Sequence, residues 1–300
     1  MNRHLKIWAA CLIALMLLLP VMAQAGQGAY AELDGHKVYY TDQGKGEPTL
    51  VLIHGWICNH NFWREQIPAL AKKHRVIALD MIGHGKSDAP QVAYTQELLA
   101  RSVLAVMNQA KVKDAVLVGH SMGLDVARRV ALEHPTRVRA LVSMDGALGL
   151  PPQEPVARAE WCKQANAFAA QFQGPDGQQK VGFFFDAMQD KTTPQALREW
   201  VKAQALATPW HVGRSSMAEF VKPANWDYRP LTIPVLAIYV PNPHLPPNFE
   251  AWLRTLFPNL RCAQIPGAGH FVMLEKPKQV NALLLEFADG KAVRGGEAGK

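Results

Sequence analysis

Ser121 stands between two glycines, in the stretch Gly119-His120-Ser121-Met122-Gly123, and this spacing is typical of a serine nucleophile. A run of small apolar residues, 115–118, leads into the stretch, and a helical pattern over 122–133 follows it. A nucleophile on a sharp strand-to-helix turn needs glycine on both sides, because side chains there would prevent the close approach of the backbones. The alternative is that Ser121 only caps the helix. The position between strand and helix favours a hydroxyl that attacks a carbonyl carbon.

A serine nucleophile needs a base, and His270 is placed to supply one. It follows a strand pattern at 261–265 through a Pro-Gly-Ala-Gly loop and precedes a helical pattern at 276–288. Neutral imidazole on such a loop can accept the serine proton near pH 7. The alternative is a loop histidine without a catalytic role. His54 and His120 adjoin a glycine and a serine at turns, where we expect structural histidines.

The carboxylate that would orient this base is harder to place. No Asp or Glu occurs between residue 234 and Glu250, the segment that follows the first strand pattern after residue 230. Asn242 lies there, but a neutral amide does not stabilise the imidazolium that forms. Asp145 stands at the carboxyl end of the preceding strand pattern, "ALVSMD". We therefore predict Asp145 as the acid, with Asn242 or no charged partner as the alternatives.

The elements that must position these residues alternate in the manner of a mostly parallel sheet flanked by helices. Strand patterns cover 37–41, 49–53, 75–79, 115–118, 140–144, 234–239 and 261–265, and helical patterns cover 62–73, 96–109 and 122–133. Further helical patterns at 157–172, 180–188 and 194–206 have no strand between them. We predict an α/β core over 26–146 and 231–289, interrupted by a helical lid over 147–230, with a tail at 290–300.

Four motifs occur in the order found in the α/β-hydrolase fold family, which the chain resembles over residues 30–289. They are VLIHGW (51–56), DMIGHGKSD (80–88), GHSMG (119–123) and GAGHFVMLEKP (267–277). The resemblance implies an oxyanion hole made by the backbone N–H groups of Trp56 and Met122. One departure is Leu124, where many members have a further glycine. A serine, rather than an aspartate, as nucleophile points away from the dehalogenase and epoxide hydrolase branches.

The predicted lid is rich in aromatic residues, most of which we expect in its own core. Candidate substrate-pocket residues are His60, Phe184, Trp210 and His244. The pattern predicts a serine hydrolase that cleaves a small to medium, largely apolar ester or lactone through an acyl-enzyme. Alternatives with the same triad are an aminopeptidase or amidase and a cofactor-free perhydrolase. An alternative of another class is a non-catalytic binding protein on a hydrolase scaffold.

The composition is that of a globular enzyme, with 49% hydrophobic and 19% charged residues. Arg3 and Lys6 precede an apolar run at 7–22 and the sequence Ala-Gln-Ala at 23–25, which predicts a signal peptide cleaved before Gly26 and a periplasmic or secreted protein. A membrane anchor is the alternative, but Pro20 and the short run disfavour it.

The remaining composition argues against several kinds of partner. The formal net charge of +7 comes without a cluster of Lys or Arg and interleaved aromatics, which disfavours nucleic-acid binding. Cys58, Cys162 and Cys262 follow the signal region, and an odd number permits at most one disulfide among them. No cysteine pair has metal-site spacing, and we predict neither a metal nor an organic cofactor.

Overall fold

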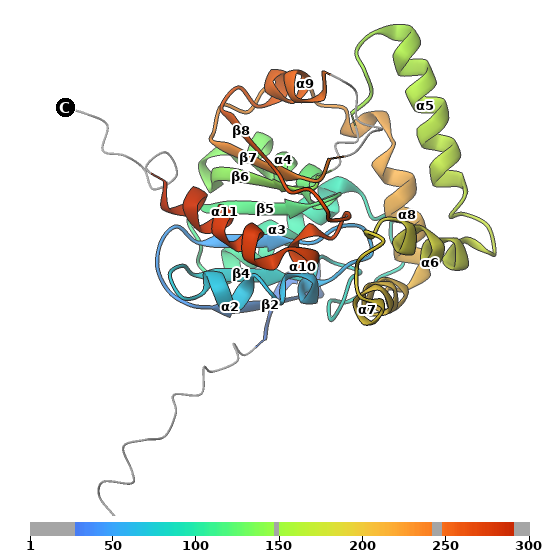
Figure 1. Cartoon of the computed structure of the whole chain (residues 1–300). Coiled ribbons are helices and arrows are strands. Elements are labelled where there is room, and N and C mark those ends of the chain that lie inside the picture. The colour runs from blue at the N-terminus through green and yellow to red at the C-terminus, as the bar shows by residue number, and fades with distance from the viewer. Residues whose placement is uncertain (1–27, 147–149, 242–247, 291–300) are drawn as a thin grey trace, which may run out of the picture.

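An eight-stranded sheet forms the centre of the molecule (Figure 1). The computed structural model describes residues 28–146, 150–241 and 248–290. The predicted signal peptide and the predicted tail beyond residue 290 therefore lie outside the described residues. The strands are β1 (Ala29–Leu33), β2 (His36–Gln43), β3 (Leu50–Ile53), β4 (Val76–Leu79), β5 (Ala115–His120), β6 (Val138–Met144), β7 (Val235–Tyr239) and β8 (Leu260–Gln264).

The sheet is mostly parallel, which confirms the predicted fold class. Its strand order is β1-β2-β4-β3-β5-β6-β7-β8, and only the pairs β1–β2 and β2–β4 are antiparallel. Every residue of β3, β4 and β5 is buried, as expected for strands covered by helices on both faces. Since parallel strands end at the same edge, the loops after β3, β5, β6 and β8 meet at one side of the sheet.

Helices cover both faces of the sheet (Figure 1). On one face, α3 (Gln96–Gln109) packs against α4 (Gly123–Glu133). On the other, α11 (Pro277–Asp289) packs against α2 (Ile67–Leu70) and α10 (Val272–Glu275). The single helix predicted at 62–73 is instead a 3-10 turn, η2 (His60–Trp63), followed by α2. Pro68 in the first turn of α2 explains the break, because proline has no N–H to donate within a continuous helix.

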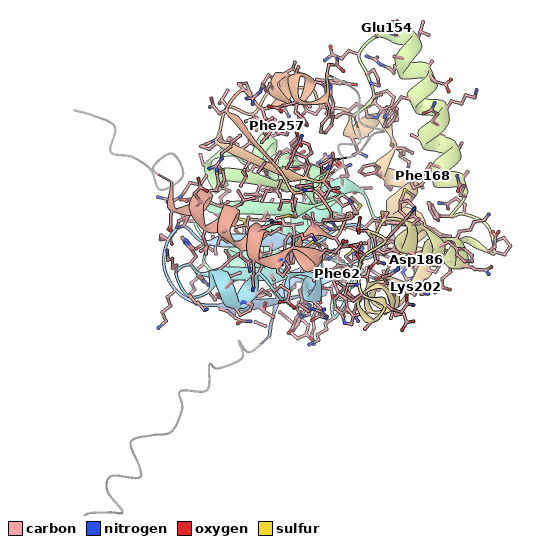
Figure 2. The ribbon with its side chains drawn as sticks, in the orientation of Figure 1. Phe62, Glu154, Phe168, Asp186, Lys202 and Phe257 are labelled. Carbon is pink, nitrogen blue, oxygen red and sulfur yellow. The ribbon has the colours of Figure 1, made fainter. Side chains whose placement is uncertain are left out.

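In the described residues, four α-helices lie between β6 and β7, in the segment predicted as a lid: α5 (Pro155–Ala170), α6 (Gly177–Ala187), α7 (Gln195–Leu206) and α8 (Trp210–Phe220). These four helices are called the lid below. Helix α8 and α9 (Phe249–Leu256) were not predicted. Glu154 caps one end of α5, whereas Phe168 near its other end packs on Phe184 of α6 at 5.2 Å between ring centroids (Figure 2). The lid is also hydrogen-bonded to the core, since Trp56 Nε1 donates to Gly213 O over 2.9 Å.

Candidate active site

Ser121 sits on a sharp turn between β5 and α4 with a backbone φ of +52°, a left-handed conformation that few serines adopt. The two flanking glycines permit this turn. A Cβ on Gly119 would lie 2.4 Å from Gly123 O, and a Cβ on Gly123 would lie 2.5 Å from Ile53 O. Both atoms belong to rigid backbone, so neither position has room for a side chain. The turn presents the Ser121 side chain at the carboxyl edge of the sheet.

The structure brings His270 and Asp145 together across 125 positions of sequence. His270 Nδ1 lies 2.6 Å from Asp145 Oδ2, and the Val240 N–H donates to Asp145 Oδ1 over 3.1 Å. Asp145 directly follows β6, has a φ of +41°, and donates its own N–H to Ile238 O over 2.7 Å. The carboxylate is thus held at both oxygens. Asn242, the alternative acid position, lies outside the described residues.

The backbone of His270 is held from two sides. Its N–H donates to Met188 O at the end of α6 over 2.8 Å, and its carbonyl accepts from His120 Nε2 over 3.0 Å. The His120 and His270 rings lie 4.7 Å apart. Burial, and then the nearby His270, hold the pKa of His120 well below its usual value, so His120 is neutral near pH 7. His120 therefore supports the His270 loop, a contact that its position next to Ser121 could have suggested.

The two predicted oxyanion donors flank Ser121. Within the described residues, neither the Trp56 N–H nor the Met122 N–H donates to a protein acceptor. The loop that carries Trp56 lies against the nucleophile turn, since a Cβ on Gly55 would be 3.0 Å from Ser121 Cβ. Two free N–H groups beside a serine are the arrangement that stabilises a tetrahedral oxyanion.

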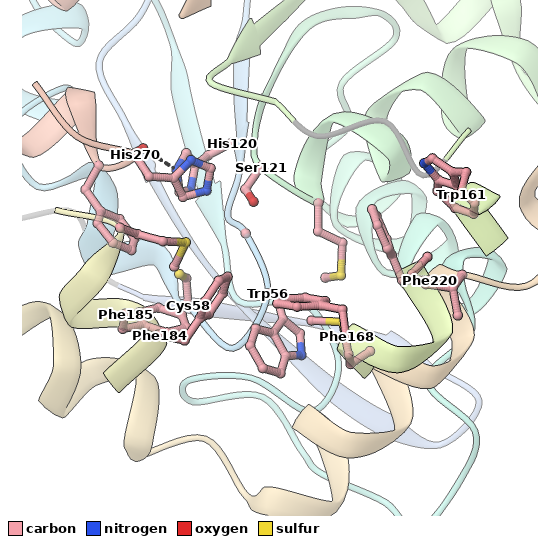
Figure 3. Close-up of a pocket in the computed structure, with 17 residues that line it drawn as sticks. Trp56, Cys58, His120, Ser121, Trp161, Phe168, Phe184, Phe185, Phe220 and His270 are labelled. Atoms are coloured by element: carbon pink, nitrogen blue, oxygen red, sulfur yellow. Dashed lines mark hydrogen bonds between the residues drawn. The ribbon is translucent and has the colours of Figure 1, made fainter. Parts of the chain in front are cut away.

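Ser121 and His270 line a cavity of about 240 Å³ between the sheet edge and the lid (Figure 3). In this view Cys58, Phe184 and Phe185 lie on the His270 side, and Trp161 and Phe220 lie on the opposite side. Apart from Gly55, His120, Ser121 and His270, the lining is aromatic, aliphatic or sulfur-containing. No Asp, Glu, Lys or Arg of the described chain lines it. The cavity therefore suits an uncharged, apolar group.

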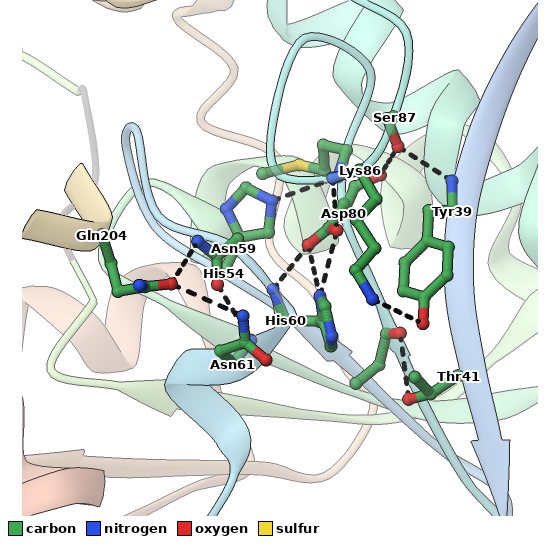
Figure 4. Close-up of polar contacts among 12 residues, drawn as sticks. Tyr39, Thr41, His54, Asn59, His60, Asn61, Asp80, Lys86, Ser87 and Gln204 are labelled. Carbon is green, nitrogen blue, oxygen red and sulfur yellow. Dashed lines mark hydrogen bonds and ion pairs between the residues drawn. The ribbon is translucent and has the colours of Figure 1, made fainter. Parts of the chain in front are cut away.

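Of the four predicted pocket residues, Phe184 lines this cavity and His60 and Trp210 do not. His60 instead donates its backbone N–H to Asp80 Oδ1 over 2.6 Å, and its Nδ1 lies 2.9 Å from the same oxygen (Figure 4). Asp80 is fully buried, and its carboxylate needs these donors.

Trp210 packs elsewhere because glycines leave room for its indole. A Cβ on Gly177 or Gly213 would lie 2.8 Å or 2.9 Å from that ring. His244, the fourth predicted pocket residue, lies outside the described residues. Sequence reasoning did not select Trp161, Phe168, Phe185 or Phe220 from the aromatic residues of the lid, since helical spacing does not distinguish pocket from core.

Cys58, Cys162 and Cys262 are free thiols, so the single permitted disulfide is not formed among them. Burial raises the pKa of Cys58, which lines the cavity as a neutral thiol. The described residues contain no group of three His, Cys, Asp or Glu side chains arranged to hold a metal ion. No helix in this part of the chain has the length and hydrophobicity of a membrane span.

A profile of the alpha/beta hydrolase fold matches residues 48–277, and the chain belongs to the α/β-hydrolase fold family. A pimeloyl-[acyl-carrier protein] methyl ester esterase of Edwardsiella ictaluri is 31% identical over 259 residues, which cover 83% of this chain and 96% of that protein. Bifunctional epoxide hydrolase 2 of Rattus norvegicus is 28% identical over 302 residues, which cover 84% of this chain and 53% of that protein. The chain thus spans about half the length of that relative.

Among solved structures, Est816, described as an N-acyl homoserine lactone degrading enzyme, superposes with a TM-score of 0.73 at 26% identity. The match covers 86% of this chain and all of that one. These relatives include an esterase, an epoxide hydrolase and a lactone-degrading enzyme, so the shared class is an α/β hydrolase.

Proposed function

We propose that this α/β hydrolase is a serine hydrolase that cleaves small to medium, apolar carboxylic esters or lactones. The observation that carries the proposal is the arrangement around one cavity: Ser121 on its strained turn and His270, bound through Nδ1 to Asp145, both line it. With Nδ1 donating to the carboxylate, Nε2 of His270 is the basic nitrogen, as the reaction requires.

The proposed reaction begins when His270 Nε2 takes the Ser121 proton as Oγ attacks the carbonyl carbon. The Trp56 and Met122 N–H groups receive the oxyanion, and one such donor lowers the barrier by about 3 kcal/mol. His270 then returns the proton to the leaving alkoxide, which leaves an acyl-enzyme. Water gives a proton to His270 Nε2 as it attacks the acyl-enzyme carbonyl; the bond to Ser121 Oγ then breaks, and His270 passes that proton to Oγ, which releases the acid and restores free Ser121. Asp145 stabilises the imidazolium in both steps.

The cavity supports a neutral substrate. Its lining carries no ionic side chain in the described residues, and burying an unpaired charge there would cost several kcal/mol. The names of two relatives, a methyl ester esterase and a lactone-degrading enzyme, agree with acyl transfer to water.

The epoxide hydrolase relatives suggest a different reaction, which Ser121 does not support. A carboxylate that opens an epoxide forms an ester, and water can then cleave that ester. A serine hydroxyl would form an ether, which the same histidine could not hydrolyse. The family likeness therefore does not transfer the epoxide reaction to this chain.

Aminopeptidase activity would require a carboxylate in the cavity to bind the substrate ammonium group. Three acidic residues of the helices between β6 and β7, Glu160, Asp186 and Glu219, do not line the cavity. Asp186 pairs with Arg198 at 2.8 Å, and Glu219 pairs with Lys222. The ester or lactone remains the better substrate class.

The test is hydrolysis of aryl esters of increasing acyl length, several lactones and an aminoacyl arylamide, with Ser121→Ala as the blank. Ester or lactone turnover that disappears in Ser121→Ala supports the proposal. Preferred cleavage of the arylamide would favour the aminopeptidase. Wild-type rates equal to the blank on all substrates would contradict the proposal and favour a binding protein.

A further inference from the structure

The peptide that joins Gly55 to Trp56 is held by its carbonyl. Gly55 O accepts from the Cys58 N–H over 3.2 Å and lies 2.8 Å from His54 Nδ1. The peptide is trans, so its N–H points away from its C=O. Whatever orients Gly55 O on one side therefore also aims the Trp56 N–H on the other.

The His54 ring has one possible arrangement of its protons. Its Nε2 accepts from the Met81 N–H over 3.1 Å and so carries no hydrogen. The proton of the neutral ring then resides on Nδ1, which donates it to Gly55 O. Burial, followed by the nearby His84, lowers the pKa of His54 to about 3, so this neutral tautomer persists at working pH.

The turn that His54 holds is strained. Ile57, two residues after Gly55, has a φ of +47°, which is unfavourable for a β-branched residue. Thr208 of the lid supports the same turn by donating from Oγ1 to Ile57 O over 3.0 Å. Because a strained turn persists only when its surroundings hold it, the contacts at Gly55 O and Ile57 O decide where the Trp56 N–H points.

We propose that His54 is a positioning residue: through Nδ1–H it holds Gly55 O and thereby aims the Trp56 N–H at the reacting oxygen beside Ser121. This inference rests on the proposed serine mechanism. His54 itself does not line the cavity, and its effect on the substrate passes through the Gly55–Trp56 peptide.

Two amide substitutions separate the two contacts of His54. In His54→Asn the side-chain amide takes the place of Nδ1 and can donate to Gly55 O, but it leaves the Met81 N–H without an acceptor. In His54→Gln the amide reaches the place of Nε2 and can accept from the Met81 N–H, but it leaves Gly55 O without this donor. His84→Asn is the control, since the His84 ring lies 4.8 Å from that of His54 but makes no contact with Gly55 O.

We expect His54→Gln to lower kcat about 10²-fold with KM changed less than about threefold, because an oxyanion donor acts mainly in the transition state. His54→Asn should retain kcat within about fivefold. The affinity for a trifluoromethyl ketone, which forms the oxyanion on Ser121, should fall in the Gln variant by the same factor as kcat/KM. His84→Asn should leave kcat unchanged, whatever it does to the free energy of unfolding.

The inference is overturned if the Asn and Gln variants have equal kcat, or if kcat follows the free energy of unfolding across all three variants. If His54→Gln does not fold, nitrogen-15 spectra of histidine-labelled wild type replace it. Binding of the ketone should then shift the Nδ1 signal of His54 and leave that of His84 in place, and an unmoved His54 signal overturns the inference. Esterase turnover that survives in Ser121→Ala would instead overturn the proposed function.

Discussion

Replacing Asp145 by asparagine tests the proposed triad most directly, because the structure determines how the amide must sit. The Val240 N–H needs an acceptor at the place of Asp145 Oδ1, so the asparagine oxygen occupies that place. Its NH₂ group then faces His270 Nδ1, which in the native chain lies 2.6 Å from Asp145 Oδ2. An NH₂ donor opposite Nδ1 favours the tautomer with the proton on Nε2, and that nitrogen can no longer accept the serine proton.

The magnitude follows from the loss of both the base and the charge that stabilises the imidazolium. We expect kcat to fall about 10³- to 10⁴-fold, as for the same change in a serine protease triad. This corresponds to roughly 4 to 5.5 kcal/mol of transition-state stabilisation. The side chains of His270 and Asp145 are 19% and 16% exposed, so solvent does little to replace the lost carboxylate.

The assay is the initial rate on the best ester of the panel, compared with wild type and Ser121→Ala. Asp88→Asn is the matched control, since Asp88 accepts the Lys37 N–H over 2.7 Å at an exposed turn and does not line the cavity. Far-ultraviolet circular dichroism and urea unfolding would establish that the variants fold. An Asp145→Asn variant within tenfold of wild type, beside an inactive Ser121→Ala, would refute the assignment of Asp145 and shift attention to the segment that contains Asn242.

Three further outcomes follow from the packing and charge of the core. Gly123→Ala places a Cβ 2.5 Å from Ile53 O, and we expect it to lower the free energy of unfolding in urea by at least about 2 kcal/mol. The control is Gly182→Ala, whose Cβ would meet nothing closer than 3.5 Å. This control variant should be as stable as the wild type or slightly more stable. Burial lowers the pKa of His54 to about 3 and that of His84 to about 4. Below pH 6.5, the ordinary pKa of histidine, both side chains therefore bind protons in the unfolded chain but stay neutral in the folded protein. The free energy of unfolding should therefore decrease as the pH is lowered from 6.5 to 4, with a slope that approaches about 1.4 kcal/mol per pH unit for each histidine. A free energy of unfolding that stays constant across this range in urea titrations would contradict the interpretation that both histidines are neutral in the folded protein. Cys58 is buried and its pKa is raised, so a thiol reagent at about pH 8 should leave it unmodified in the folded protein and modify it in urea. Peptide mass spectrometry locates the modified cysteine, and rapid labelling of Cys58 in the folded protein would show instead that the cavity is open to solvent there.

Much of the fold could be predicted because its signals are local. The helix at 96–109 was predicted with the bounds that α3 has, since Thr95 caps it and its apolar residues repeat with helical spacing. The strand patterns are similarly continuous in small apolar residues. Helix α9 was missed because a short helix carries a weak signal, whereas Pro68 marks the break before α2 and could have predicted it.

The sequence by itself determined the nucleophile turn. Gly119, Ser121 and Gly123 are close neighbours in the chain, and the steric demands of a strand-to-helix turn act over those few residues. The type of each residue is therefore enough to predict the local geometry.

The sequence predicted Asp145 as the acid but left Asn242 open, and only the tertiary structure brings Asp145 to His270 and selects the aromatic residues that surround the cavity. The contact between Asp145 and His270 spans 125 positions, and it depends on the order of β6, β7 and β8 in the sheet and on the Val240 N–H, which no residue type reveals. The same holds for His60, whose partner Asp80 is twenty residues away. Such contacts depend on how whole strands and helices pack, because a side chain's partners are set by elements that are distant in sequence and adjacent only after folding.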